Sequence, residues 1–281
     1  MITRKMKKIS VLMSVYKNDI AENIKTAVES ITNQTLKPDE IILVVDGPVS
    51  ETINACLEDL AQNIDSLEVI RLENNVGLGN ALKIGTEHCS GDYIARMDSD
   101  DIADPTRFEK QIRCFDENPV LSVVGSNGQE FFNELSHMGN IKVVPETHDA
   151  ICQFMKSRCP FCHMSVMMKK TALLEAGGYL DWYYAEDWYL WIRMYLAGAV
   201  FYNIQECLVK IRVNYDSFAR RGGFKYYKSI KKLLKLMYRH KMIGFGQYLK
   251  EKIKRFVGHV LVPKRMKKKL YMKFMREGNH A

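Results

Sequence analysis

The sequence predicts an α/β protein with a mixed, mostly parallel β-sheet and basic amphipathic helices at its C-terminal end. Two observations lead to this fold class. The first hundred residues alternate between β-prone apolar runs and segments whose apolar residues recur at helical spacing. The run Ile-Ile-Leu-Val-Val at 41–45 is apolar on both faces, as in a central parallel strand. With 281 residues, 47% of them hydrophobic, the chain can build a full core.

The elements of the first half follow from these patterns in order. Strands are expected at 9–15, 40–45, 67–72 and 93–97. Helices are expected between them, at 20–31, 53–60 and 77–88. This β-α-β order implies parallel strands joined by right-handed crossovers. One more helix follows, with Asp104 as its N-cap and Pro105 at its first position.

After residue 118 the pattern becomes α+β. Short strands are expected at 122–125, 129–132, 141–144, 165–168, 200–204 and 208–213. Helices are expected at 148–156, 170–175 and 186–197. The apolar side of the last helix carries Trp188, Trp191, Ile192 and Tyr195. We expect this half to extend the same sheet and to form a second wall of the cleft.

Charge divides the chain into an acidic body and a basic tail. The formal net charge is +8, but residues 220–281 hold twenty Lys or Arg and only two acidic residues. After Gly222, one helical face is basic and another is apolar, a pattern typical of a helix lying in a membrane interface. The basic face contains Lys225, Lys228, Lys232, Lys235 and Arg239, and the apolar face contains Tyr227, Ile230, Leu234, Met237 and Tyr238. Residues 263–275 repeat the pattern.

The tail favours an anionic membrane surface as its partner, with a solvated helix packed on the body as the alternative. Nucleic acid is not expected, because no helix-turn-helix or stacking platform accompanies the charge. No secretory signal follows the basic residues 1–8, and no apolar stretch approaches the length of about eighteen residues that a membrane span needs. We therefore expect a cytoplasmic protein that is peripheral on the inner face of the cell membrane.

An acidic run, Asp98-Ser99-Asp100-Asp101, directly follows the predicted strand at 93–97. Carboxylates pack poorly, but they suit a hard divalent cation, which prefers oxygen ligands. In open α/β sheets, ligands bind at the carboxyl ends of strands. The position and the chemistry together predict a metal and phosphate site at the end of the sheet.

The seven cysteines are expected to be free thiols. The run Cys159-Pro-Phe-Cys162-His163 matches a covalent haem motif, but such proteins are exported and this chain has no export signal. A zinc site formed by Cys152, Cys159, Cys162 and His148 is a second alternative, weakened by the absence of another C-x-x-C pair. The third alternative, a loop entering the strand at 165–168, is the expected one.

Five motifs stand in a fixed order along the chain. They are the first strand at 9–16, the second strand at 39–47, the glycine-bearing turn at 74–80, the D-x-D strand at 91–101, and Gly177-Gly178-Tyr179 followed by Ala185-Glu186-Asp187-Trp188. Together they resemble family 2 glycosyltransferases of the GT-A fold, over residues 8–215. The resemblance implies a Rossmann-like sandwich that binds a nucleotide-diphosphate sugar with Mn²⁺ or Mg²⁺.

Several roles on the donor side are implied by the resemblance. Asp100 is expected to bind the metal directly, and Asp98 to contact the ribose or reach the metal through water. Asp101 is expected either to orient its neighbours or to cap the following turn. Asp46 is expected to accept a hydrogen bond from the base, and Tyr16 to stack on the base or line its pocket. The other residues expected there are Ser14, Val15, Gly79, Ser99 and Arg71, the last with a plain surface position as its alternative.

The acceptor side needs a general base, which the resemblance assigns to Asp187 in an inverting, single-displacement reaction. Glu186 competes for that role or caps the helix. His163, Trp182 and Trp188 are expected on the acceptor side, with core packing or a satisfied loop histidine as the alternatives.

The third protein ligand of the metal stays open. Asn214 stands where family members place a histidine, and the arginines considered as phosphate clamps are Arg212, Arg220 and Arg221.

The expected domain plan is a GT-A catalytic domain at 1–219, with a nucleotide-sugar half at 8–118 and an acceptor half at 119–219, and a basic membrane-associating region at 220–281. The expected reaction moves a sugar, most simply from a UDP donor, onto a lipid-linked saccharide in capsule, exopolysaccharide or O-antigen synthesis. The sugar stays open among galactose, N-acetylglucosamine, glucose and rhamnose, and dTDP or GDP donors stay open too. The alternatives are a non-catalytic GT-A scaffold and a nucleotidyltransferase. The latter needs a glycine-rich loop after the first strand, where this chain has Lys17-Asn18-Asp19.

Overall fold

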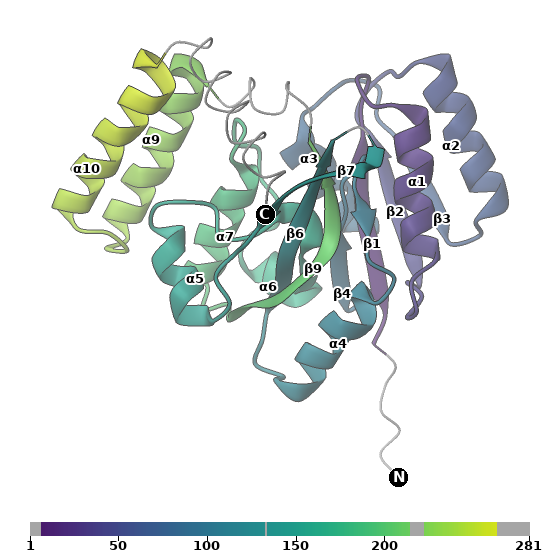
Figure 1. The fold of residues 1–281 in the computed structure, drawn as a ribbon, viewed down its shortest axis with the longest axis horizontal. Coiled ribbons are helices and arrows are strands. Elements are labelled where there is room, and N and C mark those ends of the chain that lie inside the picture. Colours follow the sequence, from purple (N-terminus) through teal and green to yellow (C-terminus); the bar gives the residue numbers. More distant parts are fainter. Residues whose placement is uncertain (1–6, 133, 214–221, 263–281) are drawn as a thin grey trace.

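The computed structural model describes residues 7–132, 134–213 and 222–262. A nine-stranded mixed sheet lies at its centre, with helices on both faces (Figure 1). The strands are β1 Ile9–Val15, β2 Glu40–Val45, β3 Leu67–Arg71, β4 Tyr93–Arg96, β5 Ile102–Ala103, β6 Val123–Phe132, β7 Glu134–Lys142, β8 Met167–Lys169 and β9 Phe201–Arg212. The helices are α1 Ala21–Thr32, α2 Glu51–Asn63, α3 Leu78–His88, α4 Arg107–Glu117, α5 His148–Met155, α6 Lys170–Glu175, α7 Glu186–Leu196, α9 Gly223–Arg239 and α10 Phe245–Phe256. The fold class predicted from the sequence is confirmed.

The first half of the sheet is parallel and contains a switch in strand order. Its strands run in the order β3-β2-β1-β4. β1 pairs with β2 on one side, where Val15 lies opposite Val45, and with β4 on the other, where Leu12 lies opposite Arg96. Because the chain leaves β1 in one direction and later returns on its other side, the carboxyl ends of β1 and β4 lie at a switch point, the place where ligands bind in such sheets.

The second half extends this sheet through antiparallel β8 and the long pair β6 and β9. Two pairs of short predicted strands each form one continuous strand, so those predicted breaks were wrong. Ser126 and Asn127 lie at the predicted break in β6, and both are buried and hydrogen-bonded: the Ser126 hydroxyl donates to the Asn127 carbonyl (2.9 Å), and Asn127 Oδ1 accepts the Val144 N–H (2.9 Å). Buried polar side chains with partners are compatible with a strand.

The sheet buries an apolar cluster on each face. Alternate residues of β1 point to opposite sides, as strand geometry requires. Val11 and Met13 join the cluster formed with α1, α2 and α4. Leu12 joins the cluster formed with α3, α5, α6, α7 and α9. Each face is therefore a packed core, and polar functional groups are left to the ends of the strands.

The start of α4 differs from the prediction. The helix begins at Arg107, with Thr106 at its N-cap, so the prediction of Asp104 as the N-cap was wrong. The Asp104 carboxylate instead accepts the Thr106 N–H (2.9 Å), and its carbonyl accepts the Arg107 N–H (3.0 Å). Asp104 thus closes the turn through Pro105 that leads into the helix.

The basic helix α9 packs its apolar side on the body. Tyr226, Ile230, Leu234 and Met237 lie in the same buried cluster as Trp191 of α7. The alternative of a helix packed on the body therefore describes α9. α10 folds back along α9 and forms the outer member of this pair, which we call the C-terminal hairpin (Figure 1). Across the described parts of the chain, no helix is both long enough and apolar enough to cross a membrane.

Candidate active site

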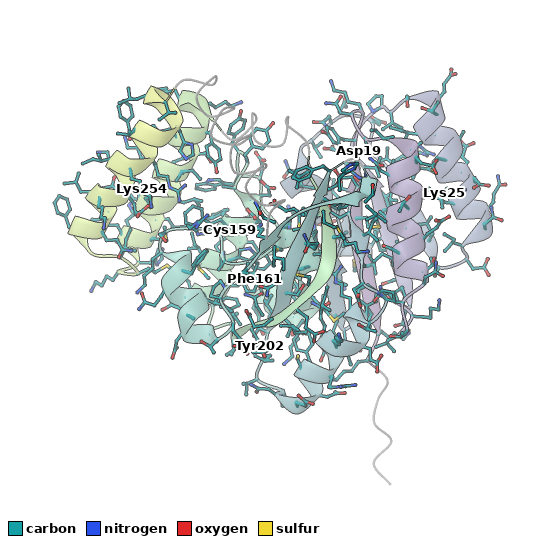
Figure 2. The ribbon with its side chains drawn as sticks, in the orientation of Figure 1. Asp19, Lys25, Cys159, Phe161, Tyr202 and Lys254 are labelled. Carbon is teal, nitrogen blue, oxygen red and sulfur yellow. The ribbon has the colours of Figure 1, made fainter. Side chains whose placement is uncertain are left out.

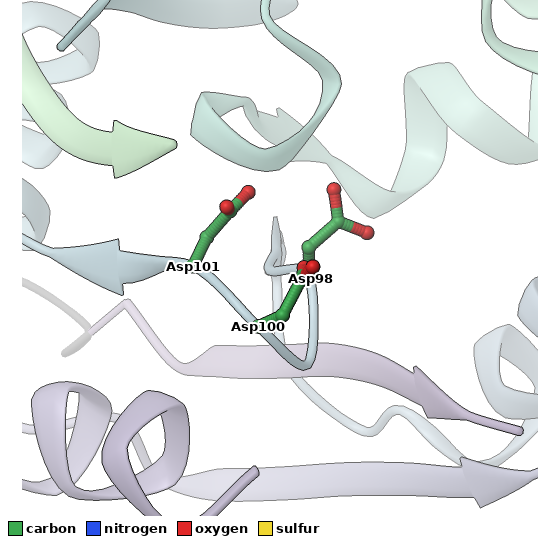
Figure 3. Close-up of side chains that lie close together, drawn as sticks. All are labelled: Asp98, Asp100 and Asp101. Carbon is green, nitrogen blue, oxygen red and sulfur yellow. The ribbon is translucent and has the colours of Figure 1, made fainter. Parts of the chain in front are cut away.

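The acidic cluster lies in the loop that follows β4, at the switch in strand order (Figure 3). Carboxylate oxygens of Asp98, Asp100 and Asp101 all lie within 4.8 Å of one another. A metal ion can be shared by three or more Asp, Glu, His or Cys side chains that lie close together. Among the described residues, this cluster meets that condition. The residues fit a hard cation, since each can contribute an oxygen ligand.

The electrostatics of the cluster also fit a bound cation. Burial, with repulsion from Asp98 and Asp19, raises the pKa of the Asp100 carboxyl to about 7. Burial, with repulsion from Asp98 and Asp100, raises the pKa of Asp101 well above its usual range. Asp101 Oδ2 is buried and has no hydrogen-bond partner among the described residues. Three carboxylates held close together in this way are stabilised by a positive charge placed between them.

Two buried arginines contact the cluster and the strand that precedes it. Arg96, at the end of β4, is 2% exposed and forms an ion pair with Asp98. Burial lowers the pKa of Arg96, but Asp98 more than offsets this, so the pKa is raised overall. Arg107 of α4 donates to the carbonyls of Arg96 (2.8 Å) and Val166 (3.2 Å). Burial, together with the nearby Arg96, lowers the pKa of Arg107 to about 9. These contacts fix the backbone from which the acidic loop emerges.

Two residues tie the cluster to neighbouring strands. Asp19, in the loop after β1, accepts the Tyr16 N–H (3.0 Å) and the Ser99 hydroxyl (2.8 Å) through Oδ2. Figure 2 shows Asp19 near the upper edge of the sheet. Arg212, at the end of β9, donates its N–H to Asp101 (2.7 Å) and its Nε to the Asp100 carbonyl (2.9 Å). Asp19 was not among the residues predicted for the site. Its position shortly after the first strand is the feature of the sequence that could have indicated it.

Asp46 follows β2 and organises the glycine-bearing turn. Its carboxylate accepts the N–H groups of Val76 (2.6 Å) and Gly77 (3.0 Å) and the Asn75 amide (2.9 Å). Gly47 has a φ of +84°, and a Cβ there would lie 2.5 Å from the Asn75 nitrogen. Only glycine allows so close an approach. A carboxylate has about four acceptor positions, so these three bonds leave about one unused on a residue that is 4% exposed.

Of the other residues predicted on the donor side, some lie beside the acidic loop and others have structural or surface positions. Ser14, Val15 and Tyr16 end β1 beside the acidic loop, where Val15 is buried and the other two are half-buried. Arg71 is exposed at the end of β3 and donates to Asn54 (2.7 Å), which is the surface position considered as its alternative. At Gly79 a Cβ would lie 2.8 Å from the Leu180 carbonyl, so this glycine lets α3 pack against residues 180–181.

Asp187 lies in the first turn of α7 and is half-buried. Its Oδ1 accepts the N–H of Trp188 (2.7 Å), and its Oδ2 accepts the thiol of Cys159 (3.1 Å). Burial, with the Asp187 charge nearby, raises the pKa of Cys159 well above its usual range, so the thiol stays protonated and acts as the donor. A helix N-terminus stabilises the ionised form of a carboxylate, which is the form that a general base requires.

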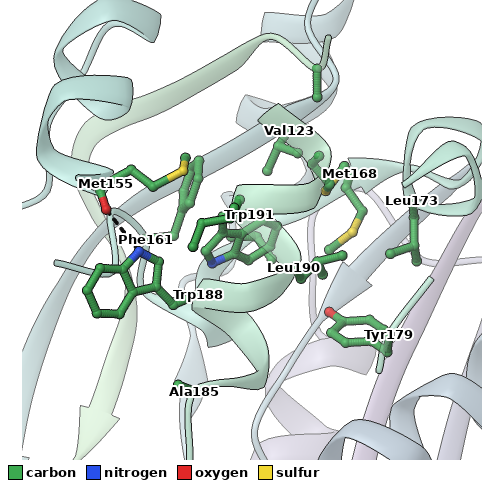
Figure 4. Close-up of a cluster of buried hydrophobic side chains, with 14 of the residues drawn as sticks. Val123, Met155, Phe161, Met168, Leu173, Tyr179, Ala185, Trp188, Leu190 and Trp191 are labelled. Atoms are coloured by element: carbon green, nitrogen blue, oxygen red, sulfur yellow. Dashed lines mark hydrogen bonds between the residues drawn. The ribbon is translucent and has the colours of Figure 1, made fainter. Parts of the chain in front are cut away.

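The residues predicted on the acceptor side are largely engaged in packing, which Figure 4 shows for Trp188. Trp188 is 4% exposed, and its indole donates to the Met155 carbonyl (3.0 Å), so the structure assigns it to the core and corrects the expected acceptor contact. His163 is 8% exposed and bonds the Tyr179 hydroxyl (3.1 Å), which is the satisfied histidine considered as its alternative. Trp182 is half-buried against Tyr189, with ring centroids 4.2 Å apart.

The cysteine motif forms a loop and a short 3₁₀ turn, His163–Ser165, before β8. Cys152, Cys159 and Cys162 are free thiols, and with His148 they do not form a shared metal site among the described residues. The structure thus favours the expected loop. Asn214, Arg220 and Arg221, named for the third ligand and the phosphate clamp, lie outside the described residues.

The mixed sheet with helices on both faces has the GT-A fold. The chain superposes on the crystal structure of S. aureus TarS 1-349 in complex with UDP-GlcNAc with a TM-score of 0.68 and 15% identity, covering 90% of this chain and 73% of that one. It also superposes on the mannosyltransferase PcManGT from Pyrobaculum calidifontis in complex with GDP-Man and Mn²⁺, with a TM-score of 0.64 and 14% identity, covering 84% and 65%. At these identities the likeness establishes the fold alone.

The family follows from the sequence comparisons. The family model for glycosyl transferase family 2 matches residues 10–174, and the chain belongs to this family. It is 39% identical to the amylovoran biosynthesis glycosyltransferase AmsE of Erwinia amylovora, over 84% of this chain and 88% of that one. It is 34% identical to the UDP-Gal:alpha-D-GlcNAc-diphosphoundecaprenol beta-1,3-galactosyltransferase of Escherichia coli, over 96% and 97%. The family predicted from the motifs is confirmed.

Proposed function

We propose that this protein transfers a sugar from a UDP-linked donor to a hydroxyl of a lipid-linked saccharide in bacterial cell-surface polysaccharide synthesis. The observation that carries the proposal is the cluster of Asp98, Asp100 and Asp101 after β4, whose carboxylate oxygens lie within 4.8 Å of one another. Asp98 pairs with Arg96. Burial raises the pKa of the neighbouring Tyr179 hydroxyl; Arg96 opposes this rise, and Asp187 and Glu186 add to it. Arg96, which pairs with Asp98, and the proposed base Asp187 thus both act on the charge state of one buried tyrosine.

On the donor side, Asp100 and Asp98 would hold Mn²⁺ or Mg²⁺, with Asp98 also near the ribose. The charge that develops on the departing diphosphate would be neutralised by a cation held there. The nucleotide lies over the end of β1, against Ser14, Val15 and Tyr16, with Ser99 beside it. The remaining acceptor position of Asp46 binds the base.

On the acceptor side, Asp187 removes the proton of the attacking hydroxyl, with Glu186 as the competing base. The hydroxyl oxygen bonds to the anomeric carbon as the bond from that carbon to the β-phosphate oxygen breaks on the opposite face. The nucleoside diphosphate leaves with the electron pair of the broken bond. A single displacement of this kind inverts the anomeric centre. Trp182 is the aromatic side chain that we retain for contact with the acceptor sugar.

The lipid-linked acceptor is supported by the E. coli relative, whose name specifies a UDP-galactose donor and a diphosphoundecaprenol acceptor. The AmsE relative supports an exopolysaccharide role. Residues 1–219 would form the catalytic domain, with 8–118 binding the donor and 119–219 the acceptor. Residues 220–281 would hold the protein on the anionic inner face of the membrane, since basic segments are attracted to that surface.

A thermal-shift screen of nucleotide sugars with Mn²⁺ tests the donor. A UDP-sugar at about one hundred times its Kd contributes about 2.7 kcal/mol to the free energy of unfolding, which raises Tm by about 5 °C for a domain of this size. We expect this shift with a UDP-sugar and its loss with EDTA. A shift with GDP- or dTDP-sugars alone would contradict the UDP assignment, and no shift with any nucleotide sugar would contradict the proposed function.

Replacing the thiol that contacts the base should change the pH dependence of transfer. Cys159→Ala removes the S–H donor from Asp187, so the carboxylate binds a proton more readily. An S–H group is a weak donor, so only the direction is expected: the acidic limb of the kcat profile should move to higher pH.

Two variants serve as controls for this shift. Cys159→Ser keeps a donor and should restore the wild-type profile. Cys114→Ala removes a half-buried thiol from α4 and should leave the profile unchanged. A Cys159→Ala profile that matches the wild type would show that the thiol does not act on the base.

A further inference from the structure

The outer helix of the C-terminal hairpin exposes an apolar side chain at every fourth residue. The series runs through α10 and continues in the π-helical turn Val257–Leu261. Its members, with their exposed fractions, are Phe245 (62%), Leu249 (41%), Ile253 (55%), Val257 (44%) and Leu261 (59%). Residues four apart are neighbours on one side of a helix, so these five form a continuous surface that we call the outer stripe.

The side of a helix that faces solvent ordinarily carries polar residues, whereas the outer stripe is apolar. Packing within the described hairpin does not explain it. Of the stripe residues, Phe245 meets the Tyr238 ring of α9 edge-on (6.2 Å between ring centroids), whereas the closer ring contacts are made by other side chains, Phe256 against Tyr227 (5.3 Å) and Tyr248 against Tyr238 (5.4 Å). Because these contacts fix the rotation of α10, the stripe faces outward. Contiguous exposed apolar surfaces mark sites that bind a protein or a membrane.

The charge around the stripe selects between those partners. Residues 222–262 hold eleven Lys or Arg and a single acidic residue, Glu251. Glu251 is 5% exposed, with Lys254 Nζ 3.5 Å away and Arg255 Nε 3.9 Å away. Lys250 and Lys254 are exposed beside the stripe, and Lys254 is visible on α10 in Figure 2. Pairing two copies through this face would bring cations against cations, which disfavours a dimer, whereas an anionic bilayer complements the charge.

We propose that the outer stripe is the membrane-inserting face of this protein: α10 lies in the interface of an anionic bilayer, with its apolar side chains in the acyl boundary and its lysines at the head groups. Interfacial helices combine an apolar face with cationic flanks in this way. The sequence had indicated α9 for this contact, but the apolar side of α9 is used for packing. The inference deepens the proposed function and rests on it only for the lipid-linked acceptor.

Flotation of the full chain with lipid vesicles tests the proposal. We expect binding to vesicles of phosphatidylcholine with phosphatidylglycerol and little binding to phosphatidylcholine alone. Leu249→Gln with Ile253→Gln should weaken binding to the anionic vesicles at least tenfold. The matched control is Val120→Gln with Leu174→Gln, two apolar residues exposed to 66% and 54% outside the hairpin, and it should bind like the wild type.

A second measurement separates insertion from charge attraction alone. Phe245→Trp should show a blue shift of tryptophan emission on anionic vesicles. Unchanged vesicle binding by the Leu249→Gln/Ile253→Gln variant would overturn the proposal. The same holds if this variant changes the oligomeric state while vesicle binding is kept, because the stripe would then join copies of the chain. The donor-induced Tm shift, which reports the proposed function separately, should be the same in both double variants.

Discussion

Asp187→Asn is expected to lose transfer activity by about a hundredfold to ten-thousandfold while binding the donor normally, because general base catalysis contributes that much to rate. The amide has the shape of the carboxylate, and its oxygen can still accept the Trp188 N–H that Asp187 now accepts. It cannot take up the proton of the attacking hydroxyl. The measurement is the initial rate of nucleoside diphosphate release with acceptor present, alongside the donor-induced Tm shift.

Glu186→Gln is the matched control for this prediction, since it removes the neighbouring carboxylate from the same helical turn. It should retain most of the activity. If Glu186→Gln is inactive and Asp187→Asn is not, the two carboxylates exchange roles. If both variants turn over normally, α7 does not supply the base and the proposed mechanism is wrong.

Asp100→Ala is expected to abolish stabilisation by Mn²⁺ and the donor and to lower turnover at least a hundredfold, because a metal acting as a Lewis acid contributes several kcal/mol to the transition state. The variant should fold. Burial and repulsion from Asp98 and Asp19 already raise the pKa of Asp100 to about 7, so removing this carboxylate relieves repulsion in the metal-free protein.

Two Tm values, with and without Mn²⁺, therefore test the Asp100 assignment independently of activity. The wild type should gain stability from the metal and Asp100→Ala should not, while the metal-free Tm of the variant should equal or exceed that of the wild type. Asp65→Ala, which removes an exposed carboxylate before β3, is the control and should respond like the wild type. A full metal response in Asp100→Ala would remove Asp100 from the site.

The parallel half of the fold was predictable because its signals are local. Runs such as 41–45 are apolar on both faces, which is typical of a central parallel strand. The predicted break in β6 was wrong because the Asn127 side chain is satisfied by a tertiary contact, with the Val144 N–H, that is absent from the local pattern. The same limit explains Trp188, whose neighbours in the sequence point to a sugar but whose partner, Met155, lies on another helix.

The candidate site divides in a similar way. The acidic cluster is contiguous, so its position after β4 was visible in the sequence. Asp19 bonds a residue 80 positions along the chain, and Arg212 bonds one 111 positions away, so the fold alone brings them together. Cys159 is the clearest case. In the sequence it belongs to a haem-like or zinc-like motif. In the structure its thiol donates to Asp187, which lies 28 positions along the chain.

The C-terminal hairpin is bonded to the segments that carry the proposed base and its thiol partner. The Ser229 hydroxyl donates to the Tyr183 carbonyl (2.8 Å), the Trp182 indole donates to the Ser229 carbonyl (3.4 Å), and Arg255 donates to the Ser157 carbonyl. A bilayer docked on α10 would therefore be connected to Asp187 through a rigid frame instead of a flexible tether. The distance between the proposed catalytic carboxylate and the lipid surface would then be fixed. The enzyme would accept substrates whose terminal sugar projects from the membrane by that distance.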